Sequence, residues 1–83
     1  MHRTAYAESG FAGTPEALFE LGLVYATGRD GERDLVAAHK WFNIAAFRGA
    51  TEAKARREEI AKDMTRGQIA EAQREAREWI TQH

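Results

Sequence analysis

Small and large apolar residues recur at helical spacing between Pro15 and Ala53, and this pattern restricts the fold more than any other feature of the chain. One side of a first helix would carry Leu18, Leu21, Gly22 and Tyr25. A second helix repeats the spacing with Ala38, Trp41, Ala45 and Ala46. Because small residues opposite large ones let two helix backbones approach closely, the pattern predicts a tightly packed helix pair.

Residues typical of helix ends mark the limits of the first helix. Thr14 can act as an N-cap, Pro15 suits the first turn, and Glu16 suits the positive end of the helix dipole. Gly28 can adopt the left-handed conformation that closes many helices. The first helix is therefore expected over Pro15–Thr27.

Three further helices follow from similar signals. Asp34 is the next N-cap, and the second helix is expected to run to Arg48. A third helix should span Thr51–Met64. Thr65 and Gln68 can then form a capping box, which would start a fourth helix that runs nearly to the C-terminus. The expected fold is all-α, with four helices in two antiparallel pairs.

The second half of the chain repeats the first only in part. Ala38 and Trp41 return as Ala76 and Trp79, whereas charged residues replace most of the apolar side of the first helix. Each helix of the second half has a single apolar stripe, which is typical of the end of a helical stack. The expected organisation is a flexible N-terminal segment over 1–13, one repeat over 14–49, and a degenerate repeat acting as a C-terminal cap over 50–83.

The residues over 15–53 resemble the Sel-one-like repeat, a longer-looped relative of the tetratricopeptide repeat. The resemblance covers just under half of the chain and rests on Ala17, Leu21, Gly22, Tyr25, Gly28, Asp34, Ala38, Trp41, Ala45, Ala46, Gly49 and Ala53. It implies a right-handed helical solenoid that acts without catalysis as an adaptor in protein complexes.

Gly22 indicates how the two helices of this repeat would fit together. A glycine inside a helix costs about 1 kcal/mol relative to alanine. That cost is tolerable if Gly22 lets the second helix approach and seats Trp41 or Tyr25 over the gap, with Ala45 and Ala46 as the opposing small surface. Gly22→Leu is then expected to destabilise the protein by overpacking.

The outer side of the first helix is the predicted protein-binding surface. It carries Phe19 and Leu23 one turn apart, with Glu16 and Glu20 beside them. An apolar pair with a polar rim is typical of interaction sites, and an acidic rim favours a basic partner segment. Three occupants remain open: residues 1–13 folding back through Tyr6 and Phe11, a second copy of the chain in a homodimer, or another protein or peptide.

Composition places further limits on function. The 12 Lys and Arg nearly balance the 13 Asp and Glu, and residues 50–83 hold seven of each sign. Nucleic-acid binding through the arginines of the C-terminal helices is therefore a distant alternative. The chain has no Cys, no apolar run as long as a membrane span, and no secretory signal over residues 1–13, so a cytoplasmic protein is expected.

No catalytic, cofactor or metal site is expected. His39 is predicted to lie on the outward side of the second helix, in solvent, and the only Ser is Ser9. Neither the histidines nor the Asp30–Glu32 loop has the spacing of a metal site. The sequence therefore favours a non-catalytic interaction or adaptor module, and the alternative is a structural capping or self-association module of a larger assembly.

Overall fold

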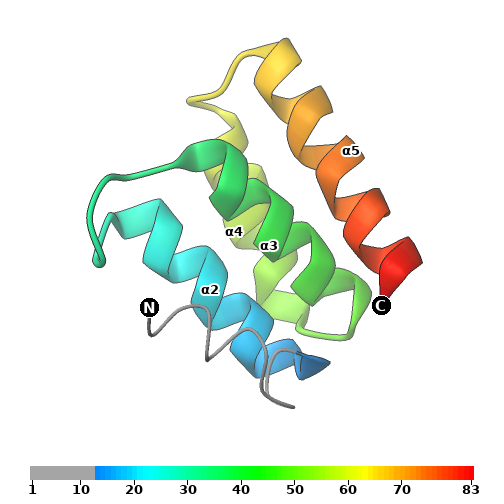
Figure 1. The fold of residues 1–83 in the computed structure, drawn as a ribbon. Coiled ribbons are helices and arrows are strands. Elements are labelled where there is room, and N and C mark those ends of the chain that lie inside the picture. Colours follow the sequence, from blue (N-terminus) through cyan, green and yellow to red (C-terminus); the bar gives the residue numbers. More distant parts are fainter. Residues whose placement is uncertain (1–12) are drawn as a thin grey trace.

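The computed structural model describes residues 13–83, and in this part of the chain it contains four helices and no strand (Figure 1). The helices are α2 (Pro15–Thr27), α3 (Leu35–Phe47), α4 (Thr51–Ala61) and α5 (Arg66–Gln82). The all-α prediction with four helices is confirmed. The expectations for Tyr6, Ser9 and Phe11 lie outside the described residues.

The predicted helix caps are present. The Ala17 N–H donates to the Thr14 hydroxyl at 3.1 Å, which begins α2. Gly28 ends α2 with φ of 74°, a left-handed conformation that favours glycine, and its N–H donates to the Val24 carbonyl. At the start of α5, Thr65 and Gln68 form the expected capping box.

Two predicted helix ends are displaced. The second helix ends at Phe47 with Arg48 as its cap, one residue before the expected end. The third helix was expected to reach Met64, and this is wrong because α4 stops at Ala61. The amides of residues 62–64 donate to the carbonyls three residues earlier, so the chain tightens into a turn before Thr65 starts α5.

The central element of the fold is α3. The chain reverses direction from each helix to the next, and α2, α4 and α5 each pack against α3 (Figure 1). Few contacts join α4 directly to α5. The second helix pair therefore differs from the first: α2 packs on α3, whereas α4 and α5 are held together mainly through α3.

Close packing between α2 and α3 is present at Gly22, but its partner differs from the expected one. A Cβ atom built on Gly22 would overlap Cδ1 and Cε1 of Phe42 and would lie 3.0 Å from its Cγ. Phe42 is 1% exposed and is among the largest fully buried side chains. The expectation that Trp41 or Tyr25 fills this gap is wrong, since both are only half-buried.

Buried side chains from all four helices form one core cluster. Leu18 from α2, Ala53 from α4 and Ala76 from α5 meet the buried residues of α3 in one cluster. Trp41 lies at the edge of this cluster, where its ring meets Trp79 edge-on at a centroid distance of 5.6 Å. The repeat residues Ala17, Leu21, Ala38 and Ala45 are all buried, as a packed helix pair requires.

Candidate functional site

The predicted contact residues occupy two environments on α2. Phe19 and Leu23 are half-buried and pack against the core cluster, while Glu16 and Glu20 are exposed. The Phe19 ring lies 5.6 Å from the Phe42 ring, centroid to centroid. The apolar pair is therefore partly covered by the molecule itself and leaves part of its surface open beside the two carboxylates.

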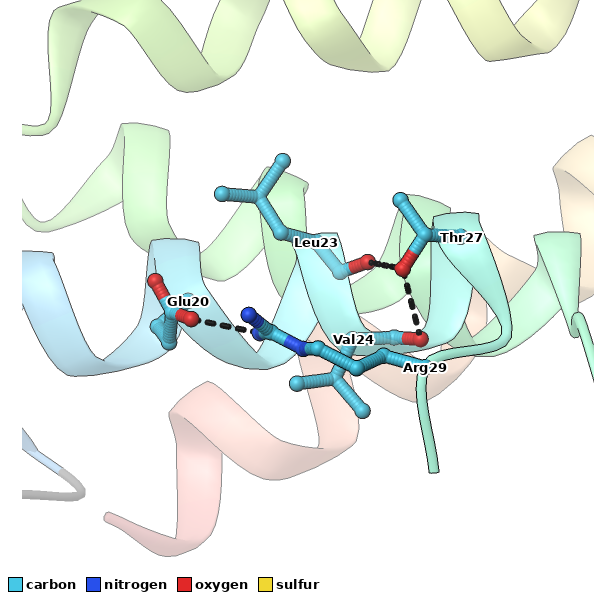
Figure 2. Close-up of polar contacts among 5 residues, drawn as sticks. All are labelled: Glu20, Leu23, Val24, Thr27 and Arg29. Atoms are coloured by element: carbon cyan, nitrogen blue, oxygen red, sulfur yellow. Dashed lines mark hydrogen bonds and ion pairs between the residues drawn. The ribbon is translucent and has the colours of Figure 1, made fainter. Parts of the chain in front are cut away.

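Hydrogen bonds and an ion pair fix the C-terminal half of α2 (Figure 2). The Thr27 hydroxyl donates to the Leu23 carbonyl at 2.8 Å, and the Arg29 guanidinium forms an ion pair with Glu20. In Figure 2 the Leu23 and Val24 side chains point to opposite sides of the helix. Arg29 thus partly neutralises the acidic rim at Glu20.

A second apolar feature lies at the end of α3. Among the described residues, Phe47 is the one large hydrophobic side chain that is exposed, at 66%. Helical spacing places Val36 and Phe47 on the side of α3 away from Ala38 and Ala45, and of the two Phe47 is exposed whereas Val36 is half-buried. Single exposed apolar side chains are common on protein surfaces, so Phe47 alone does not define a site.

A polar pocket of about 600 Å³ lies where the loop between α2 and α3 meets the turn between α4 and α5. Tyr25 contributes to its lining, and Arg33 lies 4.0 Å from Asp63 across it. Its carboxylates are Asp30, Glu32, Asp34 and Asp63. The negative charge suits a basic side chain better than a phosphate. Sequence reasoning missed this pocket because Asp63 comes from a distant part of the chain.

An aromatic cluster joins the outer parts of α3 and α5. His83 stacks on Trp79 at a centroid distance of 4.2 Å, and Trp79 meets Trp41 edge-on. Two cations lie over these rings: Lys40 Nζ is 4.6 Å from the Trp41 centroid, and the Arg48 guanidinium is 5.4 Å from that of Trp79. The contacts of Trp79 with Trp41 and with Arg48, the C-cap of α3, attach the C-terminal part of α5 to α3.

The structure contradicts the prediction for His39. This side chain was expected in solvent, but it is 3% exposed, and its Nδ1 atom has no hydrogen-bond partner among the described residues. Burial lowers the pKa of His39 below its usual 6.5, and the charge of Arg57 lowers it further. The prediction failed because it considered only the packing of α3 against α2. In the structure α4 packs against another side of α3. One turn along, Asn43 accepts a hydrogen bond of 2.7 Å from Arg57.

Several of the basic residues of the C-terminal helices have partners within the protein. Arg74 pairs with Glu78 at 3.1 Å, and Arg57 lies 3.9 Å from Glu58 while it donates to Asn43. Over residues 13–83, no group of three or more His, Asp or Glu side chains is arranged to hold a metal ion. None of the described helices combines the length and the apolar character needed to cross a membrane.

Comparison with known proteins gives no assignment: no family model, curated protein or solved structure matches the chain.

Proposed function

We propose that this chain is a non-catalytic protein-interaction module, similar in its first helix pair to Sel-one-like repeats, and that α2 carries its contact surface. The observation that supports this most strongly is the incomplete burial of Phe19 and Leu23 beside the exposed Glu16 and Glu20. Partly covered apolar side chains with a charged rim are typical of protein interfaces.

The chemistry of this surface favours a partner segment with both apolar and basic side chains. The apolar part would cover the remaining surface of Phe19 and Leu23, and a basic group would meet Glu16 at the rim. Glu20 already pairs with Arg29, so a partner that uses Glu20 must compete with that guanidinium. Rim charges of this kind contribute more to the association rate and to specificity than to affinity.

Photo-crosslinking tests the proposal without disturbing the core. A photoreactive residue is placed at Glu16 in one variant and at Gln73, an exposed position of α5, in a matched control. After irradiation in the source cells, the proposal expects a distinct protein adduct from position 16 that is absent from position 73. No adduct from position 16, or the same adducts from both positions, would refute α2 as the contact surface.

A structural role in a larger assembly is the second candidate. Most positions of α5 that do not face α3 are exposed and polar or charged, as expected for the end of a helical stack. The crosslinking masses distinguish the two functions. An adduct of twice the mass of the chain indicates self-association through α2, whereas an adduct with a different protein indicates docking.

A further inference from the structure

The buried imidazole of His39 is unusual among the polar groups of this protein. Among the described residues, His39 is the one titratable side chain that is buried, and it is 3% exposed. Its Nδ1 atom has no hydrogen-bond partner among these residues. Most buried polar groups in native proteins are hydrogen-bonded, and each exception calls for an explanation. A neutral imidazole tolerates this site far better than an imidazolium would.

The groups around His39 also oppose its protonation. Arg57 of α4 is held over α3 by its hydrogen bond to Asn43, one turn from His39, and its side chain is 25% exposed. Arg57 is the charged side chain of the described residues that acts on the pKa of His39. Its neighbour Glu58, the acidic residues of α2 (Glu16 and Glu20) and most charged residues of α5 are exposed to solvent.

The direction of the pH effect follows from these contacts. Burial first, and then Arg57, hold the pKa of His39 below 6.5 in the folded state, although contact with its own backbone acts in the opposite direction. When the α3–α4 contact opens, His39 regains the ordinary pKa. The open state then binds more protons, so the α3–α4 contact is fully stable above pH 6.5 and weakens as the pH falls below it.

The helix that rests on this site, α4, is held almost entirely through α3, where Ile60 also packs against the core. Ala53 is the buried residue of α4, and Ala50, which occupies its N-cap, makes no side-chain hydrogen bond there. Direct contacts with α5 are few. The ion pair between Arg33 and Asp63, just beyond α4, is exposed and 4.0 Å long, so it adds little.

The attachment of α5 does not depend on α4. Its buried residues Ala72 and Ala76 face α3, and Trp79 contacts Trp41 directly. The segment 50–65 would reach roughly 50 Å if extended at about 3.3 Å per residue. This exceeds the longest dimension of the molecule, 32 Å. Loss of α4 from its place therefore leaves enough chain for α5 to stay docked.

We propose that the α3–α4 contact is an acid-sensitive latch, in which protonation of His39 beside Arg57 releases α4 while α2, α3 and α5 stay packed. Release uncovers the face of α3 that carries His39 and Asn43. The device is independent of the binding surface proposed on α2, since it lies at the contact between α3 and α4.

Two measurements on the unmodified protein test the latch. In an NMR titration, the His39 ring should titrate with a midpoint below 6.5. In hydrogen exchange corrected for the intrinsic pH effect, protection of the α4 amides should fall by up to about tenfold between pH 7.5 and 5.5. Protection of α3 and α5 should change much less over the same range. A His39 midpoint at or above 6.5, or an equal loss of protection in all helices, overturns the proposal.

Two variants separate His39 from other titrating groups. His39→Leu keeps a side chain of suitable size without a titrating ring, and the pH dependence of α4 protection should disappear. His83→Gln removes a histidine that stacks on Trp79 of α5, and the pH dependence should remain. If α4 still loses protection at pH 5.5 in folded His39→Leu protein, or keeps it in His83→Gln, the assignment to His39 is wrong.

Discussion

At the scale of single residues, the contact between Gly22 and Phe42 determines how closely α2 and α3 approach. Phe42 is fully buried, and its ring occupies the space that a side chain at position 22 would need. Protein interiors are packed as densely as organic crystals, so a buried ring has little room to move aside. This explains a glycine in the middle of a helix, where alanine would otherwise be favoured.

Gly22→Ala is therefore expected to destabilise the protein although it improves helix propensity. Overpacking costs about 1–3 kcal/mol, against a propensity gain of about 1 kcal/mol. The difference leaves an expected net loss of about 1 kcal/mol, and at most about 2 kcal/mol, in urea unfolding. Gly67→Ala is the matched control, because a Cβ at Gly67 meets its nearest atom at 3.9 Å, and it should be neutral or stabilising. A Gly22→Ala protein as stable as the parent contradicts the close-packing explanation.

Phe42→Leu tests whether the Phe42 ring is the obstacle. A smaller, more adaptable side chain leaves room at position 22, so Gly22→Ala should cost less in the Phe42→Leu background than in the parent. Side chains in contact typically show a coupling above about 0.5 kcal/mol in a double-mutant cycle. Additive effects in the four-variant cycle would show that another residue limits the approach of α2.

At the scale of helices, α4 and α5 differ in how their ends and faces are stabilised. The capping box of Thr65 and Gln68 satisfies two backbone N–H donors at the start of α5, and Ala76 of this helix packs into the core cluster with α3. By contrast, α4 begins at Ala50 without a side-chain cap. The fourth helix is thus fixed by local and tertiary contacts, while the third depends mostly on its packing against α3.

Thr65→Ala should measure the local contribution to α5. Loss of the N-cap hydroxyl is expected to reduce the free energy of unfolding by about 1 kcal/mol. Thr81→Ala is the control, because the Thr81 hydroxyl donates only to the Arg77 carbonyl of its own helix and should change stability by less than about 0.5 kcal/mol. Equal losses for the two variants in urea unfolding would show that the capping box has no special role.

Four helix caps could be predicted from sequence because their determinants are local, whereas the ends of α3 and α4 differ from the predicted ones. Thr14, Gly28, Asp34 and Thr65 act on residues within one turn, and each is found at the predicted cap. The surroundings of His39 could not be predicted in the same way. A pattern over two helices assigns one inward face to each, whereas α3 is covered by three neighbours and its apparent outward side meets α4.

The candidate site was predictable to a similar, limited degree. The sequence indicated Phe19 and Leu23 as neighbours of Glu16 and Glu20, and the structure places the four residues on α2 with the two carboxylates exposed. It did not indicate that the Phe19 ring reaches Phe42, because that contact depends on how deeply α3 sits against α2. Binding of a partner by these residues remains a prediction.

At the scale of the whole molecule, α3 is the element to which the other helices are attached. Every extensive contact between two of the described helices involves α3. The core residues of α2, α4 and α5 converge on it. This arrangement accounts for the burial of Phe42 and His39 and for the independent docking of α4 and α5.

Native-state hydrogen exchange at neutral pH tests this claim most directly. If α3 holds the molecule together, its central amides can exchange only when the whole protein unfolds, so their opening free energy should equal that from urea unfolding. The amides of α4 should open at a lower free energy. Exchange of the α3 amides through a smaller opening, while α2 and α5 keep their protection, would contradict the account.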